Sequence, residues 1–377
     1  MLRGREVVAG SLLYCYSGLA TGSYLGSLAT LQQSLELAPW HISLFFTIAG
    51  LSSIILLQIT GRLADKYGAR RVGVFGIIPR AVGPLIFAFA PDLWWLLFAG
   101  VCLGAGAGCL DVAVNVLGVQ AERRRQRPVM SFLHGMWAVG NLLGALATVV
   151  VSQIFKLTPV PTMHVVVMGA AIIGAFAFTA AWIITPETEF SEPQRDAHGK
   201  VRLPIAAIML ALMAIPIGLA EGVAFDWPAI HIATVTQVDS STASLGVTAM
   251  SLLFMIIRLV GDPIVAKLGR RTTVRAGCVV AIAGFLITAF GSGLVLLLGG
   301  WALVGMGLGI ISPQIYGAAA HIGSGRGFAT VVTFNYGTSL VAPLMIGLLI
   351  EFIGIQYAMI PTAALLSALL FFAKAMP

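Results

Sequence analysis

The sequence predicts an all-α polytopic membrane protein with twelve transmembrane helices, and three observations support this fold class. Hydrophobic residues make up 58% and charged residues 10% of the 377 positions, whereas soluble domains carry about 25% charged residues. The mean hydropathy is +0.96, and apolar stretches of about 20 residues, the length that crosses a bilayer, recur along the whole chain. Lys and Arg are largely confined to alternate connections between these stretches, as expected for a multi-pass membrane protein.

Each predicted helix is an apolar stretch bounded by polar or charged connections. The basic N-terminal segment "MLRGRE" would also suit a cleaved signal peptide. We expect the first helix to be retained, because its apolar stretch is long and its removal would leave an odd number of spans. The predicted spans are 7–31, 41–60, 72–90, 93–120, 129–152, 163–185, 204–231, 241–260, 272–290, 293–319, 327–350 and 354–374.

The positive charges agree with this order of spans. Of the 22 Lys and Arg residues, nineteen lie at the two ends of the chain or in alternate loops. Lys156 lies in a loop on the opposite side, while Arg80 and Arg258 lie within spans or at their ends. This bias predicts that both termini are cytoplasmic. The net charge of +7 therefore reflects topology and does not indicate nucleic-acid binding.

The longest polar stretch, residues 186–202, separates six predicted spans from six. We accordingly expect an N-terminal six-helix domain at 1–185, a cytoplasmic loop at 186–203 and a C-terminal six-helix domain at 204–377. No further stretch is long and polar enough for a soluble domain.

The two halves also resemble each other in sequence. The loop after the second span reads "GRLADKYGARR", and the loop after the eighth reads "GDPIVAKLGRR". Gly68 of the first copy aligns with Gly269 of the second, about 200 residues later. The acidic residues, Asp65 and Asp262, do not align. The pattern indicates an internal repeat with divergent side chains.

The twelve spans, the central loop and the G-x-x-x-D-K-x-G-x-R-R pattern at 61–71 resemble the major facilitator superfamily. The resemblance covers the whole chain. It implies two pseudo-symmetric six-helix bundles around a central cavity, and alternating access by rocking of the bundles.

The loop motif predicts a cytoplasmic gate. Gly61 and Gly68 would allow a tight turn and close helix approach, and Asp65 could pair with an Arg or cap a helix. The alternative is that these charges only set topology. Arg258 and Asp262, four residues apart, would form a pair in the same gate. The predicted gate residues are Gly61, Asp65, Lys66, Gly68, Arg70, Arg71, Arg258, Asp262 and Arg270.

The stretch "GAGAGCLDVAVN" places an acid and an amide, Asp111 and Asn115, inside the fourth span. An Asp at the centre of a bilayer costs about 2.5–3.5 kcal/mol on an insertion scale. Four residues span about 40° around a helix, so both side chains share one face and should point away from lipid. A low-dielectric surrounding favours the neutral acid, so Asp111 could bind and release a proton. A structural hydrogen bond is the alternative.

Two further considerations bear on Asp111. "LDVAVN" resembles the fourth helix of the fucose–proton symporter family, in which an acid followed four residues later by Asn takes part in proton coupling. That family has a second carboxylate in the first helix, and this sequence has none there, so sugar specificity does not carry over. Arg80 lies at a similar depth in the third span and could instead hold Asp111 ionised. Alternatively, Arg80 could reach the headgroups.

The seventh span contains "GLAEGVAFDWPAI", with two acids. Glu221 is the deeper one and is the second candidate for proton coupling. Asp226 and Trp227 are expected nearer the outer surface, where aromatic residues often anchor. Pro228 predicts a bend at this end of the helix.

The remaining candidates are polar residues of the fifth, tenth and eleventh spans. His134 and Asn141 are seven residues apart and share a helix face. Together with the residues above, the predicted solute cavity comprises Asn115, His134, Asn141, Asp226, Trp227, Gln314, Tyr316 and Asn335.

These features predict a secondary active transporter in the cytoplasmic membrane, a monomer that moves a small neutral or cationic solute with protons. A proton-driven exporter of amphipathic compounds is the alternative. No enzyme motif, sensor domain or metal-ligand spacing is present in the sequence, so we expect no enzymatic activity, no cofactor and no metal. The expected partners are the solute, protons and lipid.

Overall fold

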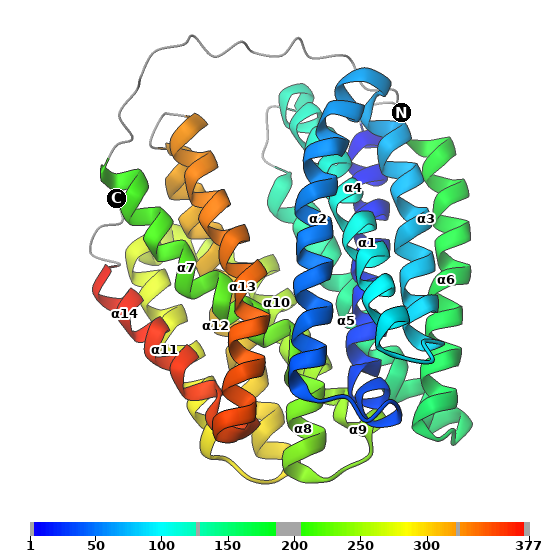
Figure 1. The fold of residues 1–377 in the computed structure, drawn as a ribbon. Coiled ribbons are helices and arrows are strands. Elements are labelled where there is room, and N and C mark those ends of the chain that lie inside the picture. Colours follow the sequence, from blue (N-terminus) through cyan, green and yellow to red (C-terminus); the bar gives the residue numbers. More distant parts are fainter. Residues whose placement is uncertain (1–3, 126–128, 186–204, 322–324, 373–377) are drawn as a thin grey trace. The chain divides into compact units, whose positions relative to one another are not determined.

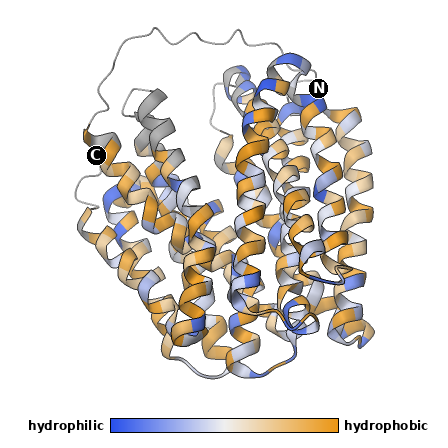
Figure 2. Ribbon diagram, in the orientation of Figure 1, coloured by the Kyte–Doolittle hydropathy of each residue, from blue (hydrophilic) through white to orange (hydrophobic). Residues whose placement is uncertain are grey.

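The computed structural model describes residues 4–125, 129–185, 205–321 and 325–372 (Figure 1). Within these ranges the chain forms fourteen α-helices and no strand. Ten of the helices are long and apolar enough to cross a membrane, and hydrophobic residues cover most of their length (Figure 2). The all-α membrane fold predicted from the sequence is confirmed.

The chain divides into two compact units. Unit 1 contains Met1–Arg195 and Ser240–Ser244, and unit 2 contains Asp196–Asp239 and Leu245–Pro377. The helices of unit 1 are α1 (Arg5–Ser34), α2 (Pro39–Tyr67), α3 (Ala69–Ala88), α4 (Leu93–Arg125), α5 (Met130–Phe155), α6 (Pro159–Ile184) and the short α9 (Ser240–Ala243).

Unit 2 holds the remaining helices, and two predicted spans are divided there. The span predicted at 204–231 breaks at Trp227, directly before Pro228, because proline lacks the N–H that would continue the helical hydrogen bonds. The span predicted at 241–260 begins with α9, which belongs to unit 1. The helices are α7 (Ile205–Asp226), α8 (Pro228–Thr236), α10 (Leu245–Leu268), α11 (Arg270–Phe290), α12 (Leu294–His321), α13 (Gly325–Tyr357) and α14 (Met359–Phe372).

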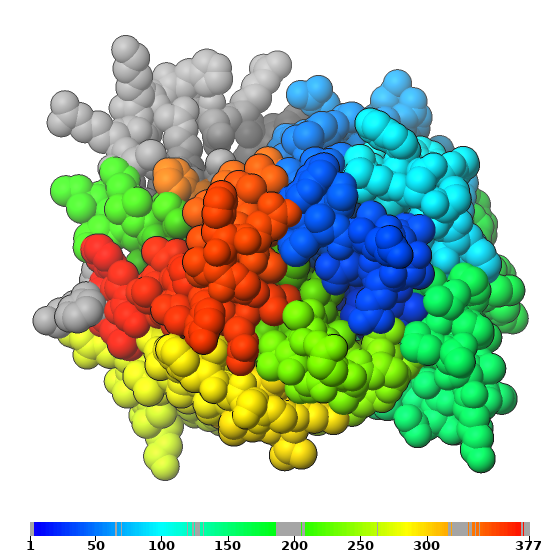
Figure 3. Space-filling view, turned by 60° about the horizontal axis from the view of Figure 1, so that its bottom comes forward, coloured from blue at the N-terminus to red at the C-terminus, as the bar shows by residue number. Residues whose placement is uncertain are grey.

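Within unit 1, the connections alternate between two ends. The α1–α2 and α5–α6 connections lie at the end remote from the N-terminus, which Figure 3 brings forward. The α2–α3 and α4–α5 connections lie at the end near the N-terminus (Figure 1). This alternation is what consecutive membrane crossings produce.

Helix α1 is buried along most of its length and packs against α3, α4, α5 and α6. It is the one long helix of unit 1 that is not among the ten apolar candidates, because small hydroxyl residues occupy its centre. These hydroxyls donate to carbonyls of their own helix, as from Thr21 to Ser17 at 2.9 Å and from Ser27 to Ser23 at 2.8 Å. A polar helix is stable in a bilayer when protein surrounds it and its polar groups are paired.

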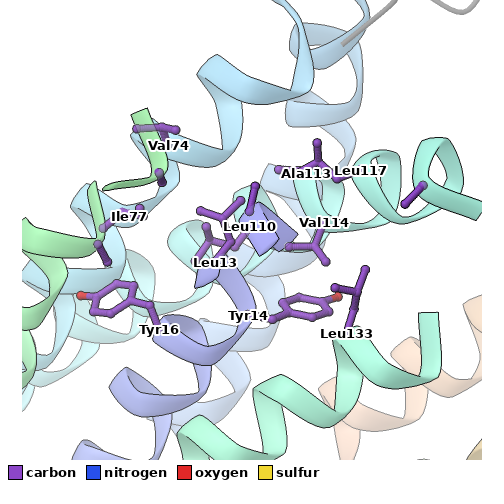
Figure 4. Close-up of a cluster of buried hydrophobic side chains, with 14 of the residues drawn as sticks. Leu13, Tyr14, Tyr16, Val74, Ile77, Leu110, Ala113, Val114, Leu117 and Leu133 are labelled. Atoms are coloured by element: carbon purple, nitrogen blue, oxygen red, sulfur yellow. The ribbon is translucent and has the colours of Figure 1, made fainter. Parts of the chain in front are cut away.

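The core of unit 1 lies where α1 meets α3, α4 and α5. Leu13, Tyr14, Leu110, Val114 and Leu133 are all at most 2% exposed there, and Figure 4 shows Tyr14 beside Leu133. This apolar packing surrounds the polar side chains described below.

Glycines let α4 and α12 pack closely against their neighbours in the same way in both units. A Cβ atom added to Gly104 would collide with the carbonyl oxygen of Ala49 on α2, and one added to Gly305 with that of Met250 on α10. Gly106 likewise lies against Arg80 of α3, and its counterpart Gly307 lies against α11. Every matched pair is 201 residues apart, so the repeat inferred from the loops extends through the helix packing.

The two related loops also share their backbone geometry. Gly68 between α2 and α3 has φ +84°, and Gly269 between α10 and α11 has φ +77°. This region of φ favours glycine, as predicted for Gly68. Gly61 differs from the prediction, because it lies inside α2, six residues before its end, and no atom of the described residues lies within 4 Å of an added Cβ. It therefore forms neither the turn nor a close helix contact.

Candidate functional site

Asp111 lies on α4 and accepts a hydrogen bond from the hydroxyl of Tyr14 on α1. The ring centroids of Tyr14 and His134 of α5 are 5.0 Å apart. Three helices of unit 1 thus bring together an acid, a phenol and an imidazole. Asp111 and His134 are partly buried, and Tyr14 is 2% exposed. The acid therefore lies inside the protein, as its position in the apolar stretch predicted.

Arg80 is held by other groups. Its guanidinium donates to the carbonyls of Ser17 at 2.9 Å and Leu103 at 3.1 Å, and to the hydroxyl of Thr21. The side chain is 4% exposed, so it does not reach the headgroups. Asp111 makes no ion pair within 4.0 Å with any side chain that the structure describes, although Arg80 lies near enough for an electrostatic interaction. The direct pair left open by the sequence is not formed in this structure.

The two predicted amides of unit 1 lie in different surroundings. Asn115, one turn after Asp111, is exposed, so the two residues do not form one buried pair. Asn141 is 0% exposed at the interface of α5 with α1. There its backbone lies against Gly18 and Gly22. In this structure Asn141 occupies a helix-packing position and does not line an accessible cavity.

In unit 2, Glu221 of α7 lies between two other helices. Its Oε1 accepts a hydrogen bond from Ser312 of α12 and lies 3.6 Å from Nη2 of Arg258 on α10. The guanidinium carbon of Arg258 lies 4.3 Å from the ring centroid of Phe254. The Glu221 and Arg258 side chains are 19% and 18% exposed. Arg258 therefore forms an ion pair with Glu221; the side chain of Asp262, its predicted partner, lies outside the described residues.

The break between α7 and α8 carries the other two candidates of this segment. Asp226 ends α7 and is partly buried. Trp227 is 0% exposed, so it is a core residue and does not anchor at the membrane surface. Nearby, His231 of α8 accepts from the indole N–H of Trp301 at 3.3 Å and contacts the carbonyl of Thr288 at 3.1 Å. These contacts make His231 part of the packing of unit 2.

The candidates of α12 and α13 are only partly described. Gln314 is 8% exposed. Asn335 is partly buried, and its Oδ1 lies next to Gly218 of α7. The side chain of Tyr316 lies outside the described residues. Of these three residues, Asn335 is the one placed against α7.

The predicted gate residues lie near the α2–α3 and α10–α11 turns. Arg70 donates to the carbonyl of Trp182 at the end of α6 and stacks on the Trp182 ring. Lys66 and Arg71 are exposed, and Arg270 is partly exposed. The side chain of Asp65 lies outside the described residues, so the structure does not test the predicted latch.

Three partners of these sites were missed by the sequence reasoning: Tyr14, Thr21 and Ser312. The internal repeat offered a signal for one of them, because Ser312 lies 201 residues after Asp111 in the aligned "GAGAGCLD" and "GMGLGIIS". Tyr14 and Thr21 lie seven residues apart on α1 with no local motif. Within the described residues no group of three or more His, Cys, Asp or Glu could hold a metal ion.

The comparison with known proteins identifies the family. Residues 10–220 match the model of the Major Facilitator Superfamily. An uncharacterised transporter, y4wD, of Sinorhizobium fredii is 32% identical over 352 residues, which is 92% of this chain and 91% of the relative. The chain therefore belongs to the major facilitator superfamily, a family of multi-pass membrane transporters.

More distant relatives span several transport activities. The class G tetracycline resistance protein of Vibrio anguillarum is 24% identical over 77% of this chain and 75% of its own. Among solved structures, a mutant of the nucleoside transporter NupG matches with a TM-score of 0.77 at 13% identity, covering 100% of both chains. The Escherichia coli fucose–proton symporter FucP matches with a TM-score of 0.64 at 16% identity, covering 98% and 97%. At these identities the structural matches establish the fold alone.

Proposed function

We propose that the protein is a secondary active transporter that moves a small solute across the cytoplasmic membrane by alternating access, coupled to protons. We further propose that it acts as a monomer with both termini in the cytoplasm. Family membership supports transport itself, and the positive charges in alternate connections support the orientation. The proposals for the solute and for proton coupling rest on the polar residues around Asp111 in unit 1 and around Glu221 in unit 2.

The observation that carries proton coupling is the setting of Asp111. The acid lies inside a membrane-spanning helix and has no ion-pair partner within 4.0 Å among the described residues. Tyr14 supplies a hydrogen bond, and Arg80 is engaged by two carbonyls and a hydroxyl. A carboxyl group in such a setting is not tied to the ionised state by a direct counter-charge. Both protonation states are then accessible as the surroundings change.

The test is solute accumulation in proteoliposomes with and without a pH gradient. One unit of pH drives at most about a tenfold gradient of an electroneutral solute per proton, since a factor of ten corresponds to 1.36 kcal/mol. Asp111→Asn should abolish this accumulation and retain solute exchange in the absence of a gradient. A variant with the wild-type response to the gradient would remove Asp111 from the mechanism.

Export of amphipathic compounds is the second candidate. It is favoured by the similarity to a tetracycline resistance protein. Inverted vesicles with a fluorescent amphipathic dye added to the medium distinguish the two candidate functions, because an exporter carries the dye into such vesicles, where it self-quenches. An exporter would lower dye fluorescence only when the gradient is present, whereas the solute transporter proposed here would leave the dye signal unchanged.

A further inference from the structure

We propose that unit 1 binds the headgroup of an anionic phospholipid where α1 and α3 begin and α6 ends. The site consists of two exposed arginines, Arg5 and Arg71, next to the exposed aromatic rings of Phe75 and Trp182. It lies at the end of unit 1 that holds the N-terminus (Figure 1). The proposal does not depend on the solute or on proton coupling.

Three helices of unit 1 come together at this site. Helices α1 and α3 both pack against α6. Arg5 of α1 donates to the carbonyl of Ile183 at 3.4 Å, and Arg70 of α3 donates to the carbonyl of Trp182. The last carbonyls of a helix have no partner within the helix, so these arginines complete the end of α6. Arg71 follows directly on α3, and basic side chains from two helices therefore gather here.

The charges of Arg5 and Arg71 are not balanced by an acid of the described residues. Both side chains are exposed, and neither forms an ion pair within the part of the chain that the structure describes. The described acids at this end have other partners. Glu6 pairs with Arg124, and Glu122 accepts from the backbone N–H groups at the start of α5.

The start of α3 adds further positive charge. Its N-cap residue, Gly68, makes no side-chain capping hydrogen bond, and its first turn contains Arg70 and Arg71 but no acid. The N-terminus of a helix carries a partial positive charge, so basic side chains there are unfavourable and an anion is favourable. A bound anion would therefore stabilise both the arginines and the helix end.

An apolar surface adjoins these charges. Arg71, Phe75 and Ile78 follow one another at spacings of four and three residues, so they share one face of α3. Phe75 and Ile78 are exposed, and the Phe75 ring meets the exposed Trp182 ring edge-on, with 6.0 Å between centroids. Exposed apolar side chains of a membrane helix face acyl chains. A lipid lying on this face would place its headgroup at the arginines.

This combination selects a phospholipid with a net negative charge. Arginine binds phosphate oxygens through parallel hydrogen bonds, and basic residues at a membrane surface attract anionic lipids. A zwitterionic headgroup brings its own ammonium and leaves the arginines without a net counter-charge. A free phosphate would meet the arginines but would not cover the apolar face.

The corresponding corner of unit 2 lacks these features. The positions 201 residues after Arg71 and Phe75 are Thr272 and Ala276. Two exposed basic residues, Lys267 and Arg271, nevertheless lie at the α10–α11 turn. They provide a matched control with the same number of charges and without the aromatic surface.

The test measures lipid binding to the purified full-length protein in detergent by native mass spectrometry. The probes are phosphatidylglycerol and phosphatidylcholine with identical acyl chains, and glycerol 3-phosphate as the free anion. We expect the tightest phosphatidylglycerol to bind about tenfold or more tightly than phosphatidylcholine, because each basic residue near a headgroup contributes to its attraction. Glycerol 3-phosphate should bind far more weakly.

Variants locate the site. Arg5→Gln combined with Arg71→Gln should remove the preference for phosphatidylglycerol, and lysine at both positions should retain much of it. Phe75→Ala should weaken the binding of both lipids and leave the preference. The unit 2 control, Lys267→Gln combined with Arg271→Gln, should keep the tightest site. A variant with an altered melting temperature is compared only by its ratio of affinities between the two lipids.

Equal binding of the two lipids by the unaltered protein, an equal loss in the unit 2 control, or glycerol 3-phosphate binding as tight as phosphatidylglycerol would overturn the assignment. The acids that follow α6 in the sequence, Glu187, Glu189 and Glu192, lie outside the described residues and are the competing occupant. A preference for phosphatidylglycerol that arises only when all three are replaced by Gln would show that the chain's own acids occupy the arginines, and the proposal would be wrong.

Discussion

The two units share the same close helix packing but place different polar side chains on it. Gly104 and Gly305 bring α4 and α12 against α2 and α10 in the same way. Seven residues later the chains diverge, with Asp111 in unit 1 and Ser312 in unit 2. In unit 2 an acid lies instead on α7, Glu221, which is paired with Arg258. Internal repetition therefore preserved the small residues that set helix spacing, while the polar groups changed position.

This difference separates two kinds of buried acid. Glu221 has a cationic partner at 3.6 Å, and Asp111 has a phenolic hydrogen bond and no ion pair within 4.0 Å among the described residues. An acid with a counter-charge is stabilised as the carboxylate, whereas one without it changes its protonation more readily. The following predictions test this contrast, from the largest expected effect to the smallest.

The largest effect should follow from removing one member of the pair in unit 2. Arg258→Gln leaves the Glu221 carboxylate uncompensated, which costs about 3 kcal/mol or more in a buried setting. The double variant Glu221→Gln with Arg258→Gln should recover most of that loss, because both charges are gone. Thermal unfolding in detergent measures both. Asp111→Asn should lower the free energy of unfolding far less than Arg258→Gln does. An equal loss in the two variants would contradict the distinction between the two acids.

The shared backbone plan predicts matched effects in the two units. Leucine at Gly104 or at Gly305 would meet a neighbouring backbone, and overpacking of this kind costs about 1–3 kcal/mol. At Gly169 in unit 1 and Gly299 in unit 2, no atom of the described part of the chain lies within 4 Å of an added Cβ, so leucine should be tolerated at both. Unfolding midpoints of the four variants check this. Unequal losses at Gly104 and Gly305 would mean that the repeat does not extend to packing energy.

Tyr14→Phe should shift the pH dependence of gradient-driven uptake. The Tyr14 hydroxyl donates to the Asp111 carboxylate, which favours the charged form. Its loss should let the acid hold its proton at higher pH, which moves the alkaline limb of the profile upward. The expected shift is about one pH unit, since hydrogen bonds to charged groups contribute about 1.5–3 kcal/mol.

Tyr16→Phe is the matched control for that shift. The Tyr16 hydroxyl is buried without a hydrogen-bond partner among the described residues, so its removal should leave the pH profile unchanged. A shift of equal size in both variants would mean that the phenol at position 14 does not act through Asp111.

The smallest expected effect concerns His231, whose imidazole makes two buried hydrogen bonds. Because His231 Nδ1 accepts from Trp301, its Nε2 carries the proton and donates to the carbonyl of Thr288. Protonation of Nδ1 would break the first bond. An unfolded histidine takes up a proton near pH 6.5, so the stability of unit 2 should fall as the pH drops below that value.

His231→Gln should lower stability by about 1 kcal/mol per hydrogen bond lost and reduce the acid sensitivity. His164 of unit 1 is partly buried, has one ring nitrogen 3.1 Å from the carbonyl oxygen of Ala88 and stacks on Phe89; it supplies the control. Unfolding temperatures recorded between about pH 5 and pH 8, the range in which histidine titrates, show whether His164→Gln changes the acid sensitivity as much.

The helices could largely be predicted from the sequence, because the bilayer imposes a length and an apolar composition on each crossing. The main departures have local causes. Pro228 divides the seventh predicted span, and the first residues of the eighth form α9, which belongs to unit 1. Helix α1 shows the limit of hydropathy, since its hydroxyl residues are tolerated only because other helices surround it.

The site residues were predicted less completely than the helices. Asp111 and Glu221 stand out because an acid in an apolar stretch is costly and needs a reason. Their partners could not be predicted, because Tyr14 and Ser312 belong to distant helices and are ordinary residues in their own segments. Arg258 shows the same limit: the spacing of four residues favoured Asp262, whose side chain lies outside the described residues, and gave no sign that the fold brings Glu221 of another helix within 3.6 Å.

The sequence by itself determined the membrane class, the positions of the crossings and the repeat, because hydrophobic length, charge bias and periodic glycines are local properties of the chain. Only the tertiary structure decided which charges meet. Whether a buried acid has a counter-charge depends on the rotation and spacing of neighbouring helices, and these follow from packing across the whole unit. The contrast between Asp111 and Glu221 is therefore a property of the fold that neither helix carries in its own sequence.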